Sequence, residues 1–472
     1  MSEASTLDSD SKVDGGAKAK GGAKAPFFAE LPKERLETRL KDKKPPYSDA
    51  EAVAEANRCI YCSDAPCINA CPTGIDIPTF IHKIATGNVK GAARTIFEEN
   101  LLGTSCARVC PVDVLCVGDC VYNHWGRPPI QIGRLQRYAT ETALARDPEL
   151  LSRTKRPSTG KKIALIGAGP ASLACAGHLA LDGHKAVIFE KKRLPGGLNT
   201  LGIAPYKLKA DDALREIEFV LGLGDVELKT GASVVTGAVK DSDVSAADLL
   251  EDYDAVFVGV GLGTDSALGI PGEDGPGVHG AVRFIERLKS DPSLSLDGVK
   301  SAVVLGGGNT AIDAARELAL LGVKDVAMVY RRDAVKMSGY AHEMEGARKE
   351  AVRLVEDRVP VEILRDGSGQ LTGLVVAPAK DGKPIAGAPA EIVACDLIAV
   401  AIGQARLTEL ALAFEGVKLD DKGRVVVDEA TCRTGNAKVY AGGDCVNGGK
   451  EVVNAAQHGK LAARAITAAL SG

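Results

Sequence analysis

The sequence predicts an α/β chain in which a helical N-terminal region precedes two doubly wound parallel sheets. From Lys161 onward, apolar strand-like segments alternate with Ala-rich helical segments, and a Gly-rich turn links strand to helix twice. Upstream of Lys161, helical patterns and closely spaced cysteines replace the strands. The 472 residues are too many for one hydrophobic core, so several domains are expected.

The composition describes a globular chain with little attraction for polyanions. Hydrophobic residues make up 45% and charged residues 25%, and the net charge is −4. This balance favours neither nucleic acid nor a membrane surface. Residues 1–25 are rich in Gly, Ala, Lys and Ser, which predicts a disordered tail. No signal-peptide pattern or membrane-span pattern is found, so the expected location is the cytoplasm.

The region from about Pro26 to Asp147 reads as helical. Ser48 and Glu51 form a capping-box pattern ahead of an Ala-rich helix that leads toward Cys59. Two further short helices are predicted over residues 76–88 and 89–100, and a polar linker follows from residue 147. This region therefore presents its cysteines from short helices and turns.

Eight of the twelve cysteines lie in two runs within this helical region. The runs read Cys59-x2-Cys62-x4-Cys67-x3-Cys71-Pro72 and Cys106-x3-Cys110-Pro111-x4-Cys116-x3-Cys120. In a large chain without a secretory signal, such runs indicate ligands rather than disulfides. Soft thiolates followed by proline suit iron–sulfur clusters. The alternatives are two structural zinc sites or free buried thiols; zinc ribbons favour paired Cys-x2-Cys knuckles, and only one is present.

The first Gly-rich turn has the pattern of an adenine-dinucleotide site. Gly167 permits the tight turn, and Gly169 lets the backbone approach a pyrophosphate at the helix N-terminus. Ser172 replaces the third glycine and is small enough for close helix packing. Glu190 ends the next strand, where a carboxylate bonds a ribose hydroxyl. The alternative for Glu190 is a solvated strand end.

The second turn, at Gly306 to Gly308, precedes a strand that ends in Arg331 and Arg332 rather than in an acid. Arginines at this point can hold a 2′-phosphate, and each charged hydrogen bond contributes roughly 1.5–3 kcal/mol. The pattern therefore predicts NADPH rather than NADH. The alternative is a solvated basic strand end.

The C-terminal segment indicates that the first dinucleotide is FAD. A strand, a Gly-Gly-Asp turn and a long helix follow one another from residue 438. Asp444 is placed to bond a polyol such as the ribityl chain, and the helix after Lys450 directs its positive N-terminus at the flavin. Further expected cofactor-binding residues are Gly197, Leu198, Gly308, Asn309 and Thr310.

These observations predict an N-terminal all-α iron–sulfur domain followed by two doubly wound Rossmann-like nucleotide-binding domains. The segment Ala399 to Gln404 is interpreted as the return from the NADPH domain to the FAD domain. The predicted boundaries are a tail at 1–25, the [4Fe–4S] domain at 26–155, FAD-domain parts at 156–275 and 405–472, and the NADPH domain at 276–404.

The motifs occur in an order that resembles a known family. The cysteine runs, GAGPAS, GGGNTA, VYRR and AGGD resemble the flavin-containing small subunit of NADPH glutamate synthase. They equally resemble the matching N-terminal part of dihydropyrimidine dehydrogenase. The resemblance implies FAD, NADPH and two [4Fe–4S] clusters. It also implies hydride transfer from NADPH to FAD, onward electron transfer to a partner subunit, and no catalytic side chain.

Gln136 favours the pyrimidine-reducing branch of this family. A Gln in its segment, PIQIGRLQRYATE, is a cluster ligand there, whereas glutamate synthase small subunits typically have Glu. The resemblance assigns Cys59, Cys62, Cys67 and Cys120 to one cluster, and Cys71, Cys110, Cys116 and Gln136 to the other. Cys106 is then a packed bystander thiol. The alternative for Gln136 is an ordinary surface amide.

The resemblance also implies a partner. Pyrimidine reduction needs an FMN-binding barrel, for which this sequence has no room, so an FMN-containing dihydropyrimidine dehydrogenase large subunit is expected. The alternative partner is a glutamate synthase large subunit. A thioredoxin-reductase-like enzyme is disfavoured because Cys395 is the one cysteine between Gly277 and Gln404. A cofactor-binding sensor or scaffold without turnover is the remaining alternative.

Overall fold

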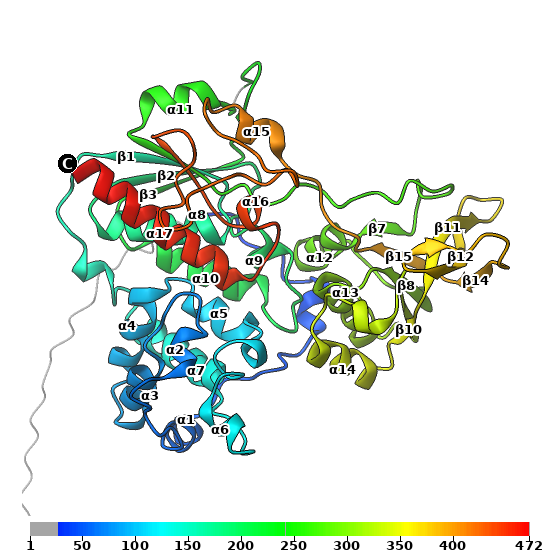
Figure 1. The fold of residues 1–472 in the computed structure, drawn as a ribbon, viewed down its shortest axis with the longest axis horizontal. Helices are drawn as coiled ribbons and strands as arrows, with labels where there is room; N and C mark the ends of the chain where they lie inside the picture. The colour runs from blue at the N-terminus through cyan, green and yellow to red at the C-terminus, as the bar shows by residue number, and fades with distance from the viewer. Residues whose placement is uncertain (1–26, 241, 472) are drawn as a thin grey trace, which may run out of the picture.

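The computed structural model describes residues 27–240 and 242–471, so the predicted tail at 1–25 lies outside the described residues. Figure 1 shows a helical lobe below one parallel sheet and beside a second. The fold class predicted from the sequence is confirmed, and the helices and strands follow the expected order except over residues 358–394. None of the helices in the described ranges is long and apolar enough to cross a membrane.

The helical lobe consists of short helices around a small core. Its helices are α1 (Asp49–Ala56), α2 (Pro66–Asn69), α3 (Ile77–Ala85), α4 (Val89–Glu99), α5 (Gly103–Val109), α6 (Val121–His124) and α7 (Ile132–Arg146). The capping box predicted at Ser48 and Glu51 is present at the start of α1. Phe80, Ile84 and Ile96 are fully buried where α3 and α4 meet α7. The apolar faces of these amphipathic helices therefore close the lobe.

The first sheet draws its strands from two distant parts of the chain. Its order is β16 (Val439–Ala441), β6 (Ala255–Val258), β1 (Lys162–Ile166), β2 (Lys185–Glu190) and β3 (Val226–Thr230), and every pairing is parallel. One face packs on α8 (Pro170–Leu181), α10 (Ala210–Leu221) and α17 (Val452–Ser471). The other face packs on α11 (Ala246–Asp252) and α15 (Thr408–Leu412). Because both faces are covered, the strands are apolar throughout.

The second sheet is also parallel. Its order is β10 (Arg353–Val355), β9 (Asp325–Val329), β8 (Ser301–Leu305), β15 (Leu397–Val400) and β7 (Val278–Gly280). Helices α12 (Ala281–Ser290), α13 (Asn309–Leu320) and α14 (Ala341–Lys349) cover one face. The short η1 (Leu36–Arg39) adds Leu36 and the neighbouring Leu40 to this core.

An antiparallel sheet that the sequence reading did not anticipate covers the other face. It contains β11 (Arg358–Arg365), β12 (Leu371–Lys380), β13 (Lys383–Pro384) and β14 (Glu391–Ala394). Ile363, Leu374 and Val376 of this sheet pack against Val303 and Ile398. A sheet therefore takes the place of the helices that a doubly wound domain usually has there.

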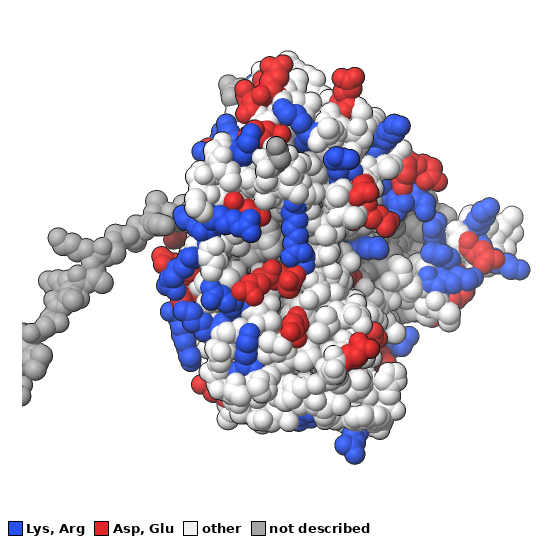
Figure 2. All heavy atoms as spheres, turned by 60° about the vertical axis from the view of Figure 1, so that its left-hand side comes forward, with Lys and Arg blue, Asp and Glu red and all other residues white. Residues whose placement is uncertain are grey.

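The remaining elements are short connectors at the edges of these layers. They are η2 (Val112–Val114), η3 (Ser152–Thr154), η4 (Ala334–Lys336), α9 (Leu198–Leu201), α16 (Asp444–Asn447), β4 (Val234–Val235) and β5 (Val244–Ser245). Acidic and basic side chains are interspersed over much of the face shown in Figure 2. This mixture agrees with the small net charge of −4.

Candidate cofactor sites

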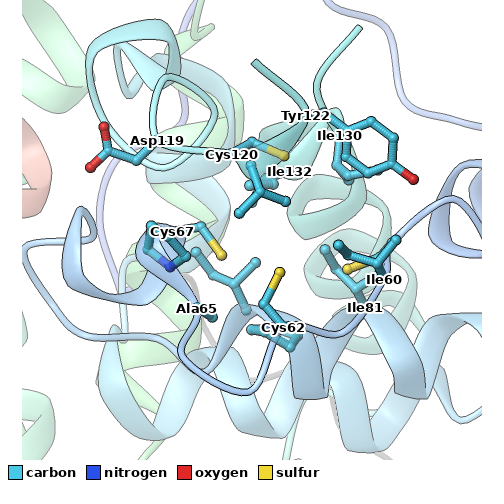
Figure 3. A pocket seen from close by; sticks show the side chains of 15 residues that line it. Ile60, Cys62, Ala65, Cys67, Ile81, Asp119, Cys120, Tyr122, Ile130 and Ile132 are labelled. Atoms are coloured by element: carbon cyan, nitrogen blue, oxygen red, sulfur yellow. The ribbon is translucent and has the colours of Figure 1, made fainter. Parts of the chain in front are cut away.

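The first cysteine set lines one small pocket of the helical lobe. Cys59 and Cys62 lie on the loop after α1, Cys67 lies in α2, and Cys120 directly precedes α6. Figure 3 shows the side chains of Cys62, Cys67 and Cys120 pointing toward one another across this pocket. The rest of the lining is mostly apolar, from isoleucine, proline and alanine. The structure therefore gathers the four cysteines that the resemblance assigned to one cluster.

The surroundings of this pocket suit an iron–sulfur centre. Burial raises the pKa of the Cys59 thiol, and burial together with Cys59, Cys120 and Cys62 raises the pKa of Cys67 to about 12. A cationic metal centre reverses this preference and holds the sulfurs as thiolates. Within the described ranges, no three His, Cys, Asp or Glu side chains converge closely enough for a single ion.

The second cysteine set adjoins the first. Cys71 follows α2, Cys110 ends α5, and Cys116 follows η2. The pKa of Cys110 is raised by its hydrogen bond with Cys106, by burial, and by the nearby Cys116 and Cys71. Burial raises the pKa of Cys116 to about 12, and Cys71 and Cys67 contribute. The two runs are therefore interleaved in space.

Gln136 lies in α7 against the helix that leads into Cys110. Its amide nitrogen donates to the Gly103 carbonyl at 2.7 Å, and its side chain is buried rather than on the surface. This bond orients the amide plane, and no hydrogen bond from a described residue to Oε1 accompanies it. The lone pairs of Oε1 are therefore available to a metal or to a hydrogen-bond donor. Cys106 is 2% exposed and is hydrogen-bonded to Cys110, so it is the alternative to Gln136 as the fourth ligand of the second set.

A cleft of about 1720 Å³ extends from the first Gly-rich turn to the start of α13, the helix that follows the second turn. At the first turn, Gly167 has φ +86° and a Cβ there would lie 2.8 Å from the Gly259 carbonyl oxygen, so glycine is required. Gly169 directly precedes α8, and a Cβ there would meet only the Gly259 carbonyl oxygen, at 3.8 Å. Ser172 is fully buried beneath Gly259 and does not line the cleft, so its contribution is close packing.

Glu190 stands at the wall of this cleft with both carboxylate oxygens engaged. It accepts hydrogen bonds from the backbone N–H of Ala168 and of Lys192, each at 2.8 Å. Glu190 is 7% exposed, so the alternative of a solvated strand end is wrong. A carboxylate can accept about four hydrogen bonds, which leaves capacity for ribose hydroxyls.

Three further predicted residues line the same part of the cleft. Gly197 has φ +54° and turns the chain into α9, whose first residue is Leu198. Asp444 begins α16 and accepts a hydrogen bond from Lys450 N–H at 3.2 Å. Burial raises the pKa of Asp444. The N-terminal turn of α17 closes this end of the cleft, as a flavin-facing helix requires.

The second turn presents the N-terminus of α13 to the cleft. Gly306 has φ +142°, and a Cβ there would lie 2.3 Å from the Ala401 carbonyl oxygen. Gly308 precedes α13, whose first residues Asn309 and Thr310 line the cleft. Asn309 also accepts a hydrogen bond from Tyr340 N–H at 2.9 Å.

Arg331 and Arg332 lie beyond the cleft lining, at the end of β9. Arg331 is exposed, and the Arg332 guanidinium lies 5.5 Å from the ring centre of Tyr330. Neither arginine forms an ion pair with a carboxylate within the described ranges. Both guanidinium groups are therefore available to an anionic ligand at this strand end.

Residues of the helical lobe form one wall of the nucleotide cleft, which the sequence did not indicate. Val109, Pro111, Val114 and Leu115, which flank Cys110 and Cys116, line it together with the flavin-side residues. Tyr340 also reaches across the cleft, where its hydroxyl donates to Glu451 at 2.7 Å. The second cysteine set therefore lies beside the cleft.

A buried carboxylate joins the lobe to the first sheet. Glu216 of α10 accepts hydrogen bonds from Thr104 N–H at 2.7 Å and Ser105 N–H at 3.1 Å, and also from the Ser105 hydroxyl. Asn199, at the cleft wall, donates to the same hydroxyl at 2.8 Å. Burial raises the pKa of Glu216 to about 7. No sequence motif marks these contacts.

A helical cysteine domain joined to two dinucleotide turns defines an iron–sulfur oxidoreductase that uses a pyridine nucleotide. Residues 36–148 match the family described as dihydropyrimidine dehydrogenase domain II, 4Fe-4S cluster. Residues 161–459 match the pyridine nucleotide-disulphide oxidoreductases, and the chain belongs to that family.

Similar proteins come from both branches of the predicted resemblance. The chain is 36% identical over 446 residues to the glutamate synthase [NADPH] small chain of Escherichia coli K12, covering 89% of this chain and 92% of that one. It is 33% identical over 445 residues to the NAD-dependent dihydropyrimidine dehydrogenase subunit PreT of the same organism, covering 92% and 98%. Thioredoxin reductase from T. acidophilum shares the fold, with a TM-score of 0.53 and 20% identity over 66% of this chain and 100% of that one.

Proposed function

We propose that this chain is the electron-input subunit of a two-subunit NADPH-dependent oxidoreductase, and that its partner reduces uracil or thymine to the dihydropyrimidine. The observation that supports the electron-input role is the shared cleft. The first dinucleotide turn, the start of α13 after the second turn, and the segment flanking Cys110 and Cys116 line this one cavity. A nicotinamide, a flavin and an iron–sulfur centre placed at these walls are neighbours.

The chain's own residues bind and orient the cofactors. When bound, FAD accepts a hydride from NADPH and passes its electrons on singly to iron–sulfur centres. The N-termini of α8 and α13 hold the two pyrophosphates, while Glu190 and Asp444 hold hydroxyl groups of the FAD. Arg331 and Arg332 select NADPH by its 2′-phosphate. Hydride transfer needs no side-chain acid or nucleophile, because correct positioning of the nicotinamide against the flavin accelerates it.

Cluster ligation follows the two cysteine sets. We assign Cys59, Cys62, Cys67 and Cys120 to one [4Fe–4S] cluster, and Cys71, Cys110, Cys116 and Gln136 to the other. The second set is next to the cleft, so a cluster held there would be the one placed to accept electrons from a flavin in the cleft.

Gln136 is the observation that favours pyrimidine reduction. Its buried amide is oriented by Gly103, and its Oε1 is left without a protein donor. An amide oxygen held in this way suits the unusual ligand of the pyrimidine-reducing branch better than it suits packing. The second candidate, the small subunit of NADPH glutamate synthase, is supported by the 36% identity to that chain over 446 residues.

Two measurements test the proposal. Protein purified without oxygen is expected to show flavin absorbance and about eight iron atoms per chain, and NADPH is expected to bleach it. Zinc without flavin would refute the electron-input role.

Reconstitution with each partner decides between the branches. Uracil- or thymine-dependent NADPH oxidation is expected when a dihydropyrimidine dehydrogenase FMN subunit is added. Activity with glutamine, 2-oxoglutarate and a glutamate synthase large subunit, but not with the FMN subunit, would establish the second candidate instead.

A further inference from the structure

One buried ammonium group lies between the flavin side of the cleft and the second cysteine set. Lys460 belongs to α17, the C-terminal helix of the FAD-binding sheet, and it is 2% exposed. Its Nζ donates to the Thr73 carbonyl oxygen at 2.7 Å and to Glu99 Oε2 at 2.8 Å. Both acceptors belong to the helical lobe. A fully buried lysine is rare unless it is paired, so this contact is a specific arrangement.

The contact at Thr73 brings the charge close to a proposed cluster ligand. Thr73 lies two residues after Cys71, and its hydroxyl is 3.4 Å from the Cys71 sulfur. The pKa of Lys460 is lowered by burial, while Glu99 and the nearby Cys71 oppose that effect. The ammonium is therefore within electrostatic range of the Cys71 sulfur.

The position of Lys460 is fixed by backbone packing. The preceding residue, Gly459, lies so close to α8 that a Cβ would come within 2.2 Å of the Ala171 carbonyl oxygen. Ala455, five residues before Lys460 in α17, lines the cleft. About 7.5 Å of helix rise separates the two positions. Figure 1 shows α17 lying across the first sheet above the helical lobe. One rigid helix thus links the cleft to the Cys71 loop.

The surrounding charges leave a net positive field on the Cys71 side. Glu99 is 37% exposed at its side chain, so water screens its carboxylate, whereas the Lys460 side chain is 3% exposed. Arg464, 3.6 Å from Glu99, is 58% exposed at its side chain, so water screens its charge as well and Lys460 is the dominant buried charge. The neighbouring His178 adds none at neutral pH, because burial, Lys460 and Arg464 lower its pKa to about 3.

We propose that Lys460 is a positioning residue for the iron–sulfur centre at Cys71: its ammonium raises the reduction potential of that centre and so favours its acceptance of flavin electrons. The inference rests on the proposed electron-input function. The step moves one electron from the flavin, reduced by NADPH, to the centre at Cys71. Lys460 keeps its proton throughout, and no bond forms or breaks at it. A reduced centre carries one more negative charge, which a nearby buried cation stabilises.

Charge substitutions at both ends of the pair test the proposal. The full-length, cluster-loaded protein is titrated with a chemical reductant under anaerobic conditions, and each centre is followed by its electron paramagnetic resonance signal. Lys460→Gln, which keeps a donor for Thr73, is expected to lower the potential of one centre and leave the other unchanged. Lys460→Arg, which keeps the positive charge, is expected to leave the reduction potentials of both centres unchanged. Glu99→Gln is expected to raise the same potential that Lys460→Gln lowers.

The outcomes separate this proposal from the proposed function. NADPH is expected to reduce the flavin of Lys460→Gln at the normal rate, while the share of electrons reaching the affected centre falls on the order of tenfold. Full iron content with both potentials unchanged, or with both shifted equally, would overturn the role. If the Lys460→Gln protein loses iron, the Glu99→Gln protein provides the test instead. An unchanged or lowered reduction potential of the Cys71 centre in Glu99→Gln would then overturn the proposed role of Lys460. Neither partner nor substrate enters the titration, so failure of the pyrimidine assignment leaves this result intact.

Discussion

Replacing Glu216 with Gln is expected to remove a loss of folding stability at high pH that arises at the junction between the helical lobe and the first sheet. Glu216 is fully buried and accepts hydrogen bonds from Thr104 and Ser105. Burial is the main cause that raises its pKa from 4.5 to about 7. The native protein therefore holds this proton more tightly than the unfolded chain, so Glu216 favours folding most at low pH.

The size of the effect follows from the two pKa values. The stabilising contribution is complete below pH 4.5 and is lost as the pH rises through about 7. The full change corresponds to about 3.4 kcal/mol, of which about 2.5 kcal/mol falls between pH 5 and pH 8. Gln has no proton to lose and still offers an acceptor to the Thr104 and Ser105 amides. The stability of Glu216→Gln relative to the wild type should therefore rise by about 2.5 kcal/mol over this range.

Urea unfolding of the cluster-loaded protein at pH 5 and pH 8 measures this difference. The only tryptophan, Trp125, lies in the helical lobe and reports on its unfolding by fluorescence. Glu218→Gln, on the exposed side of the same helix α10, is the matched control and is expected to follow the wild type. An equal stability difference between Glu216→Gln and wild type at both pH values would refute the reasoning.

Three further predictions concern the cofactor sites. Arg331→Ala is expected to raise the Michaelis constant for NADPH about ten- to a hundredfold and to leave that for NADH nearly unchanged; equal effects in steady-state assays would contradict the 2′-phosphate role. Gly167→Ala is expected to lose FAD, measured as flavin per chain, whereas Gly160→Ala, with φ +73° but open space around it, should retain FAD. Gln136→Ala is expected to alter the paramagnetic resonance signal of one centre, and Cys106→Ala to leave both signals and the iron content unchanged; the reverse pattern would make Cys106 the ligand.

The fold class was predictable because its determinants are local. Each buried strand is a short apolar run, and each dinucleotide turn needs glycine at a defined backbone angle, as Gly167 and Gly306 show. The antiparallel sheet over residues 358–394 was missed for a local reason too. In β12 (Leu371–Lys380), buried and half-buried residues alternate irregularly, and a bulge shifts its register against β11, so no clean period-two pattern is visible.

Residues of the candidate sites were predictable only where they belong to a sequence motif. The cysteine spacing indicated two runs, and only the family resemblance divided them into two interleaved sets. In the structure, Cys59, Cys62, Cys67 and Cys120 line one pocket, and Cys71 and Cys116 lie near Cys110. The residues that join the domains were not predicted, because their partners are remote in the chain. Glu216 meets Ser105 across 111 positions, and Lys460 meets Thr73 across 387. In the sequence, each looks like an ordinary charged residue on the solvent side of an amphipathic helix.

Glu216 and Lys460 together show that docking of the helical lobe depends on buried charged groups contributed by the helices of the first sheet. An isolated buried charge costs several kcal/mol, so a buried acid and a buried base persist only while the lobe supplies their partners. Glu216 of α10 holds the start of α5, the helix that leads into Cys110, and Lys460 of α17 holds the loop after Cys71. Both therefore fix the second cysteine set against the nucleotide cleft. A substitution that loosens either contact should separate that set from the flavin site before it disturbs the first set, which lines its own pocket within the lobe.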